Sequence, residues 1–321
     1  MTPTGPRAAG GPVVSVVIVC RNEAALIGRT IGCVAAQSLD DLEIIVVDDA
    51  SGDASVATAR DALADCGRAH SLLELPASLG PAGARNAGVL HARGTYVAFL
   101  DAGDEWLTDK LARQVGVMAG DPGVTLCGCQ AVWRDEPRGH ERRLFHELPP
   151  AMRDGWRRLL WSRFITPATA MARREDLGTA PFDAALAGDA ARGLWFHLAS
   201  NGTVALVPDV LVRLGTAAGG AQSHSAELVR EVTRPMVLRH VAAFSDVLTL
   251  RDKLRAHAAL QGELGEALCR SPHGYLRGAI HLLLAGLLGY RPQAGLAEMV
   301  RLAPPLRTLR QRRGQAPAAT P

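Results

Sequence analysis

Residues 13–19 read Val-Val-Ser-Val-Val-Ile-Val, a run of β-branched side chains with the length of a strand. The polar triplet Arg21-Asn22-Glu23 closes this run, and apolar residues then recur at helical spacing between Leu26 and Val34. The order predicts a strand, a loop and a helix. Because apolar and polar residues do not alternate within the run, we expect both faces of this strand to be buried.

The same order of strand, loop and helix recurs further along the chain. Residues 42–47 form a second apolar run that ends in Asp48-Asp49, and 72–75 form a weaker third run. A fourth run, 96–100, ends in Asp101-Ala-Gly-Asp104. Apolar strands that are each followed by a helix indicate an α/β fold with a mainly parallel central sheet covered by helices.

Polar residues follow three of these strands at the point where each strand ends. Right-handed crossovers place the carboxyl ends of parallel strands at one edge of the sheet, where ligands bind in such folds. A single aspartate after a strand can instead be only a helix N-cap. Since the loops at 21–23, 48–49 and 101–104 would all meet at that edge, we favour a ligand site there.

The rest of the chain is organised differently. Strands are expected at 124–133, 168–172 and 204–207, a helix at 194–199, and a helical pattern beyond Ser223. The predicted organisation is a disordered leader over 1–12, an α/β domain over 13–222, a helical region over 223–305 and a basic, Ala/Pro-rich tail over 306–321.

Charge and cysteine content limit the possible partners and compartment. The net charge of +3 gives no chain-wide reason to expect nucleic-acid binding. The six cysteines form no Cys-x-x-Cys pair, so we expect buried thiols and a reducing cytoplasm.

An apolar segment lies near the C-terminal end. Residues 278–290 are 13 residues long, whereas a bilayer span needs about 20. With the arginines that follow, this segment could lie on an anionic membrane surface as a peripheral contact. A buried hairpin of ordinary helices gives the same pattern, and the sequence leaves both interpretations open.

Five sequence blocks occur in a fixed order. They are VSVVIVCRNE at 14–23, LEIIVVDDAS at 42–51, GPAGARNAG at 80–88, RGTYVAFLD at 93–101 and DEW at 104–106. Together they resemble the inverting family 2 glycosyltransferases, which have the GT-A fold. The resemblance implies transfer of a sugar from a nucleotide-diphosphate donor, a UDP-sugar, to a saccharide or lipid-linked acceptor. It further implies surface polysaccharide or glycoconjugate biosynthesis in the cytoplasm, at the inner face of a bacterial cell membrane.

The resemblance also assigns the donor site. Asp49, with Asp48 beside it, would accept a hydrogen bond from the base, and Arg85 and Asn86 would approach the diphosphate or ribose. Arginine suits phosphate because its donors form a fork. The implied donor-binding residues are Val19, Arg21, Glu23, Asp48, Asp49, Arg85, Asn86 and Asp101.

A divalent cation, Mn²⁺ or Mg²⁺, would neutralise the diphosphate in such an enzyme. The family strand typically ends Asp-x-Asp-Asp, but this chain reads Asp101-Ala102-Gly103-Asp104, and glycine has no side chain to bind a metal. Asp101 and Asp104 are the predicted ligands. Stabilisation of the leaving group by Arg and Lys, or weakened catalysis, are the alternatives.

Inversion requires a general base for the acceptor hydroxyl. The family places an acidic pair before a Leu-Trp helix, and Asp189, before Leu194-Trp195, is the predicted base. Asp189 could instead be an N-cap, and Asp183 is a weaker candidate. Trp106 is a candidate for stacking on the sugar. The altered motifs also allow a catalytically impaired homologue that binds nucleotide or saccharide without turnover.

Overall fold

The structure is a computed structural model that describes residues 11–135, 140–145, 148–215, 225–270 and 275–288. These residues fall into two compact units. The first lies within 1–159 and 163–222, and the second within 160–162 and 223–321. Each unit is described by itself below.

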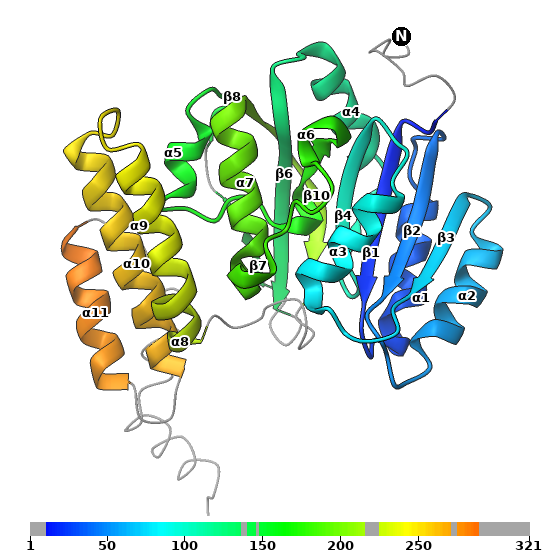
Figure 1. The fold of residues 1–321 in the computed structure, drawn as a ribbon, viewed down its shortest axis with the longest axis horizontal. Coiled ribbons are helices and arrows are strands. Elements are labelled where there is room, and N and C mark those ends of the chain that lie inside the picture. The colour runs from blue at the N-terminus through cyan, green and yellow to red at the C-terminus, as the bar shows by residue number, and fades with distance from the viewer. Residues whose placement is uncertain (1–10, 136–139, 146–147, 216–224, 271–274, 289–321) are drawn as a thin grey trace, which may run out of the picture. The chain divides into compact units, whose positions relative to one another are not determined.

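The first unit is built on one sheet, to which the described residues contribute ten strands in the order β3-β2-β1-β4-β9-β6-β10-β5 (Figure 1). In addition, β7 pairs with β6 and β8 with β10. Pairing is parallel from β3 through β4 and between β6 and β10, and antiparallel elsewhere. The strands are β1 (Val14–Cys20), β2 (Leu42–Asp48), β3 (Ala69–Glu74), β4 (Tyr96–Asp101), β5 (Glu105–Trp106), β6 (Val124–Asp135), β7 (His140–Arg143), β8 (Ala151–Met152), β9 (Met171–Arg173) and β10 (Thr203–Leu214).

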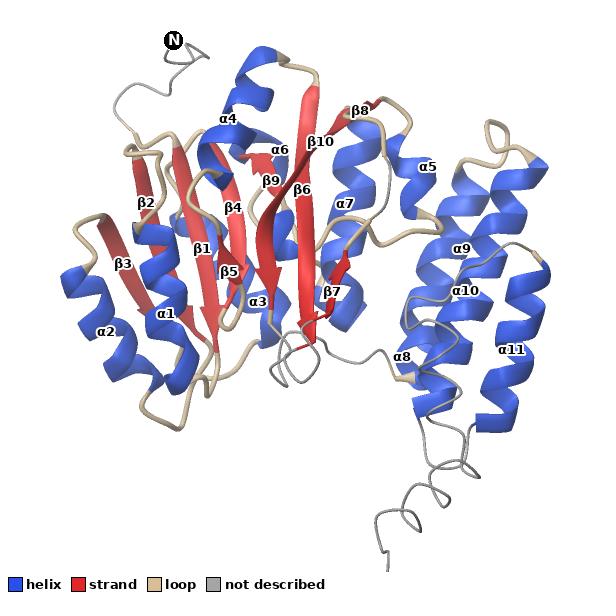
Figure 2. Cartoon of the chain, turned by 180° about the vertical axis from the view of Figure 1, so that it is seen from behind, coloured by secondary structure: helices blue, strands red, loops and turns tan. Residues whose placement is uncertain are grey.

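Helices cover both faces of this sheet. Helices α1 and α4 lie on one face (Figure 2), and α3 and α7 lie on the other (Figure 1). The α/β fold predicted from the strand and helix pattern is therefore confirmed. The helical elements of this unit are α1 (Ala24–Ala35), α2 (Ser55–Asp65), α3 (Gly80–His91), α4 (Lys110–Gly120), α5 (Gly155–Leu159), η1 (Pro167–Thr169), α6 (Arg174–Leu177), η2 (Ala184–Asp189) and α7 (Ala190–Asn201).

The core of the first unit lies along β1 and β2, where every residue is buried. Apolar side chains such as Ile18, Ile27 and Ile44 are entirely removed from solvent. This burial on both faces explains the unbroken apolar runs in the sequence. The six cysteines are free thiols, four of them buried, in agreement with their predicted use as small apolar side chains.

Three predicted strands differ from the structure. The last strand, expected at 204–207, extends to Leu214. The third strand begins earlier than expected, at Ala69 rather than Leu72. The strand expected at 168–172 is divided, because a 3₁₀ turn occupies Pro167–Thr169 and pairing begins only at Met171. The Ala170 N–H donates to the Pro167 carbonyl within this turn, so it is not available to the sheet.

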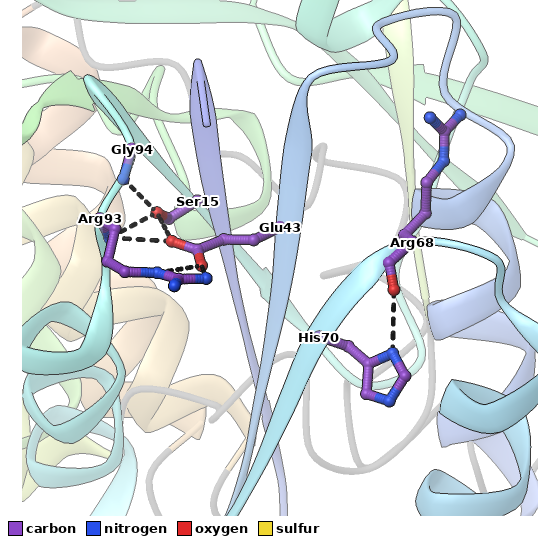
Figure 3. Close-up of polar contacts among 6 residues, drawn as sticks. All are labelled: Ser15, Glu43, Arg68, His70, Arg93 and Gly94. Atoms are coloured by element: carbon purple, nitrogen blue, oxygen red, sulfur yellow. Dashed lines mark hydrogen bonds and ion pairs between the residues drawn. The ribbon is translucent and has the colours of Figure 1, made fainter. Parts of the chain in front are cut away.

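A polar network around the buried Glu43 joins the starts of the central strands (Figure 3). The Glu43 carboxylate accepts from the Ser15 hydroxyl at 2.6 Å and from the Arg93 N–H at 2.8 Å. The Arg93 guanidinium adds contacts at 2.9 and 2.6 Å. Burial alone would raise the pKa of Glu43, but these hydrogen bonds outweigh it and hold the pKa below its ordinary value. The network therefore ties β1 and β2 to the chain entering β4.

The second unit is helical in its described part. It contains α8 (Ala226–Leu228), the π-helical turn η3 (Val229–Thr233), α9 (Arg234–Ala243), α10 (Leu250–Arg270) and α11 (Tyr275–Leu287). Val229, Leu264 and Leu268 are among the residues of its apolar core. Among the described helices, none has the length and apolar character that crossing a membrane requires.

The contact between α3 and β1 depends on Gly88. A Cβ atom at this position would meet Val17 Cγ1 at 2.3 Å, and Val17 is itself fully buried. We expect Gly88→Ala to lower the free energy of unfolding by about 1–3 kcal/mol, because the core has to shift. Gly116→Ala, at an exposed position of α4 where no atom lies within 4 Å of the new Cβ, should be neutral or stabilise by up to about 1 kcal/mol. Urea unfolding of both variants measures this, and equal effects would contradict the packing argument.

Candidate functional site

Strand register brings the predicted site residues to one edge of the sheet. Within the parallel sheet, Val19 of β1 lies opposite Val47 of β2 and Asp101 of β4. One residue further, Cys20 lies opposite Asp48. The loops that follow β1, β2 and β4 therefore begin at the same level of the sheet, as predicted from the parallel arrangement.

The loops after β1 and β2 are bound to each other. The Asn22 N–H donates to the Ser51 hydroxyl at 2.9 Å, and the Asn22 side chain accepts from the Gly52 N–H at 2.8 Å. Asn22 and Ala50 both have positive φ, at 55° and 56°, which is unfavourable for alanine and is held here by these contacts. This arrangement leaves Arg21 exposed and Glu23 half-buried at the edge.

Asp48 and Asp49 are both buried and both bind backbone. Asp49 accepts from the Leu79 N–H at 2.7 Å, the Ser78 hydroxyl at 2.7 Å and the Gly80 N–H at 3.1 Å. It therefore holds the start of α3. Asp48 accepts from the Ser51 N–H at 2.9 Å. The predicted contact of these carboxylates with the nucleotide base stays a prediction. In this structure they fix the loop after β2 and the start of α3.

Arg85, on α3, reaches the end of β4. Its Nη2 atom lies 2.7 Å from both carboxylate oxygens of Asp101, and the arginine is only 8% exposed. The Nε atom of Arg85 is buried without a hydrogen-bond partner among the described residues. Arg85 and Asp101, both predicted to bind the sugar-nucleotide, thus form an ion pair. In the part of the chain that the structure describes, the Nε–H of Arg85 is left free to donate a hydrogen bond to a ligand.

Asn86 binds the segment before η2 in this structure, and its predicted approach to the diphosphate or ribose stays a prediction. Its side-chain amide donates to the Phe182 carbonyl at 2.8 Å and accepts from the Phe182 N–H at 2.9 Å. Phe182 also packs against Phe99. The Arg85 guanidinium lies over the Phe182 ring, with its Cζ atom 5.6 Å from the ring centre. Asn86 therefore attaches the segment that precedes η2 to α3, beside Arg85.

Three carboxylates at this edge influence one another. Burial, together with the charge of Asp101, raises the pKa of Asp104 to about 7. Burial likewise raises the pKa of Glu23 to about 7, although the Arg21 N–H opposes it, and the charges of Asp101 and Asp53 add to the rise. Glu23 and Asp104 are thus partly protonated near neutral pH.

Hydrogen bonds and an ion pair within the chain occupy the polar groups of the turn after β4. Gly103 has φ of +99°, and its N–H donates to the Thr30 hydroxyl at 3.1 Å. Asp104 accepts from the Gly215 N–H at 2.8 Å, while Asp101 pairs with Arg85. Within the described residues no group of three or more His, Cys, Asp or Glu side chains is arranged to hold a metal ion. The donor set at Asp101 and Asp104 therefore does not fit a resident divalent cation in this arrangement.

Comparison with known families agrees with the fold. Residues 15–179, just over half of the 321-residue chain, match the family described as Glycosyl transferase family 2. The chain belongs to glycosyltransferase family 2. This confirms the family resemblance of the five sequence blocks.

Curated relatives match over about a third of this family 2 chain. It is 39% identical over 105 residues to the amylovoran biosynthesis glycosyltransferase AmsB of Erwinia amylovora, covering 32% of this chain and 35% of AmsB. It is 39% identical over 104 residues to the succinoglycan biosynthesis protein ExoO of Rhizobium meliloti, covering 32% and 29%. The Escherichia coli protein named UDP-Glc:alpha-D-GlcNAc-diphosphoundecaprenol beta-1,3-glucosyltransferase WfaP is 32% identical over 109 residues, covering 33% and 41%. The chain therefore matches less than half the length of each of these relatives.

Solved structures support the GT-A fold. The structure of residues 1–349 of S. aureus TarS in complex with UDP has a TM-score of 0.55 at 19% identity, covering 95% of this chain and 93% of that one. The mannosyltransferase PcManGT of Pyrobaculum calidifontis, in complex with GDP-Man and Mn²⁺, has a TM-score of 0.56 at 22% identity, covering 96% and 86%. At these identities the likeness concerns the fold alone.

Asp189, the predicted base of this family 2 chain, lies at the N-cap position of α7. Its carboxylate makes no capping hydrogen bond to the helix and instead pairs with Arg163 at 2.6 Å, with no side-chain exposure. Ala187, two residues earlier, has φ of 43° and ψ of −122°, a strained conformation for alanine. Asp183 caps η2 by accepting from the Ala185 N–H at 2.9 Å. The carboxylate of the predicted base is thus buried and engaged by Arg163 in this structure.

Trp106 is a core residue, in contrast to its predicted role in sugar stacking. It is 3% exposed, and its indole N–H donates to the Ala168 carbonyl at 2.8 Å. The fully buried Lys110 ammonium lies 3.8 Å from the centre of its ring. Because the indole is 3% exposed and its N–H is already bonded inside the unit, a sugar has no access to it.

Three residues at the site were not anticipated from the sequence. Thr30 supports the Gly103 turn, Gly215 donates to Asp104, and Arg163 pairs with Asp189. Each lies 26 or more positions from its partner along the chain. No local sequence pattern marks residues that are so far apart in the chain. The one available signal is that Arg163 is a charged residue directly before the apolar Phe164-Ile165.

The raised pKa of Asp104 predicts a pH dependence of stability. Because the folded state binds this proton more tightly than the unfolded state, the contribution is fully present below about pH 4 and is lost as the pH rises through about 7. Asp104→Asn keeps an acceptor for the Gly215 N–H and removes the titration. We expect the free energy of unfolding of the wild type to fall more steeply between pH 5 and 8 than that of the variant, by up to about 1.4 kcal/mol per pH unit. Urea unfolding at four pH values measures this, and parallel curves would count against it.

Proposed function

We propose that this family 2 protein transfers a sugar from a UDP-sugar to a saccharide or lipid-linked acceptor, with inversion at the anomeric carbon. The observation that carries the proposal is the Arg85–Asp101 pair beside Glu23 and Asp104 at the carboxyl edge of the parallel strands. That edge is where nucleotides bind in open α/β sheets. Transfer with inversion would proceed by a single displacement.

The names of the relatives support a role in surface polysaccharide assembly. AmsB is named for amylovoran biosynthesis and ExoO for succinoglycan biosynthesis, and the name of WfaP specifies a UDP-Glc donor and a diphosphoundecaprenol-linked acceptor. By analogy we propose that this chain acts on cell-envelope polysaccharide at the cytoplasmic face of a bacterial membrane. Peripheral contact of the C-terminal region with that membrane forms part of the proposal.

Arg85 is our candidate for neutralising the diphosphate. Its unpartnered Nε–H and forked guanidinium suit phosphate oxygens, and burial strengthens such a contact. A Mn²⁺ or Mg²⁺ ion at Asp101 and Asp104 is the alternative. Such an ion would have to displace Arg85 from Asp101 and ionise Asp104, whose pKa is about 7. Since Gly103 supplies no further ligand, we favour the arginine.

Asp189 remains our candidate for the general base. It lies at the end of η2, and the segment before η2 is attached to α3 by Asn86. In the structure its carboxylate is buried against Arg163, so an acceptor hydroxyl would reach it only after this ion pair opens. The same burial favours a second candidate function, namely binding of nucleotide or saccharide without turnover.

Nucleoside diphosphate release distinguishes the two candidate functions. The full-length protein is incubated with UDP-sugars and GDP-sugars, with oligosaccharide and polyprenyl-diphosphate-linked acceptors, and released UDP or GDP is measured. Transfer predicts acceptor-dependent release that Asp189→Asn lowers by at least about 100-fold, as expected when a general base is lost. Binding of UDP without release from any donor would instead support the non-catalytic function.

UDP binding tests the role of Arg85 separately. Arg85→Ala should weaken UDP affinity by about tenfold or more, since it removes charged hydrogen bonds to phosphate. Arg60→Ala, which removes an exposed arginine paired with Glu74, is the matched control and should leave affinity unchanged. Calorimetric titration with UDP measures both. If excess Mn²⁺ raises wild-type affinity tenfold and Arg85→Ala has no effect, the arginine proposal is wrong.

A further inference from the structure

Residues 159–163, which we call the connecting segment, link the two compact units through the backbone. Residues 160–162 belong to the helical unit, whereas Leu159 and Arg163 on either side belong to the first unit. Leu160 is fully buried, and Trp161 is half-buried. Whatever holds residues 160–162 in the helical unit therefore also restrains Leu159 and Arg163.

Both ends of the connecting segment are bound to the start of α7. The Arg192 guanidinium donates to the Leu159 carbonyl from Nε at 3.2 Å and from Nη2 at 2.9 Å. Arg163 Nη1 donates to Asp189 at 2.6 Å. Because Arg192 is 5% exposed and Asp189 is 1% exposed, water competes little for these contacts. The candidate base is thus engaged by one end of the connecting segment.

The middle of the connecting segment is held within the helical unit. The Arg255 guanidinium of α10 lies over the Trp161 ring, with its Cζ atom 5.6 Å from the ring centre. At this distance a guanidinium is attracted to the face of an aromatic ring, and tryptophan is the strongest such partner. Only Ser162 separates Trp161 from Arg163, and two residues of chain reach at most about 7 Å. A displacement of Trp161 is therefore passed on to Arg163 with little slack.

The backbone next to Asp189 is strained. Ala187 has φ of 43° and ψ of −122°, a conformation that alanine adopts only where surrounding contacts impose it. Release of the Arg163–Asp189 contact would let this turn relax and would free the carboxylate for an acceptor hydroxyl. The ion pair and the strained turn thus distinguish a closed state, which the structure shows, from an open one.

We propose that the connecting segment is a latch on the candidate base, which keeps Asp189 closed against Arg163 until the helical unit releases Trp161. The inference rests on the proposed function, because it assigns the regulation of the base in that function. Opening of the latch requires no turnover, however, so it can be measured in a protein that transfers no sugar. The two proposals can therefore fail separately.

Hydrogen exchange of the full-length protein measures the latch without turnover. Trp161→Ala should raise the exchange rate of amides in 184–197 by about fivefold, because the Trp161 contact no longer favours the closed state. Arg255→Gln, at an exposed residue, should raise it by about two- to fivefold. Trp161→Phe keeps an aromatic ring and should stay within about twofold of the wild type. Arg251→Gln, at an exposed arginine one turn earlier on α10, is the matched control and should exchange as the wild type does.

Sugar transfer shows whether the latch restrains the base. If the closed state is inhibitory, Trp161→Ala and Arg255→Gln should raise kcat for acceptor-dependent nucleoside diphosphate release by about two- to fivefold. UDP affinity should stay within about twofold of the wild type, because the donor edge is unchanged. A residue that only supports the fold would lower kcat when it is replaced, so a gain identifies the latch.

Each outcome bears on one of the two proposals. Circular dichroism of each variant should match the wild type, and if Trp161→Ala fails to fold, Arg255→Gln decides the question. Unchanged exchange in 184–197 overturns the latch, and so does faster exchange with an equal or lower kcat in a wild type that transfers sugar. If neither the wild type nor any variant releases nucleoside diphosphate, the proposed function fails, and hydrogen exchange alone then decides whether the latch exists.

Discussion

The parallel pairing of β1 between β2 and β4 is the constraint on which the rest of the structure depends. Its hydrogen-bonded register places Asp48 opposite Cys20 and Asp101 opposite Val19. A shift by one residue would turn each of these side chains to the other face of the sheet. The apolar runs of β1 and β2 and the Glu43 network at their starts hold this register. The candidate donor site is thus a consequence of how the core is assembled.

Buried carboxylates at the two edges of the sheet have pKa values shifted in opposite directions. At the starts of the strands, Glu43 is satisfied by Ser15 and Arg93, and its pKa lies below the ordinary value. At the carboxyl edge, burial and mutual repulsion raise the pKa of Glu23 and Asp104. Among the described residues, the buried Nε–H of Arg85 there has no hydrogen-bond partner. A satisfied network stabilises a fold, whereas an incompletely satisfied one leaves groups that a ligand can bind.

Several family motif residues serve the scaffold in this chain. Asp49 holds the start of α3, Asn86 holds the segment before η2, and Lys110 with Trp106 supports the core beneath η1. These contacts fix the backbone around the donor edge and determine where Arg85 points. Motif residues therefore contribute to a site by positioning it as well as by touching its ligand.

The sequence by itself determined the parallel strands β1, β2 and β4, the helices that follow them and the loops that would meet at their carboxyl edge. Period and β-branched runs are local properties, and parallel connectivity then fixes which loops converge. Only the tertiary structure decided what each polar group binds. Arg85 pairs with Asp101, and Asp189 is buried against Arg163. The Gly103 N–H donates to the Thr30 hydroxyl. These partners are distant in the chain, and burial and charge act through space, so no local pattern of residues encodes them.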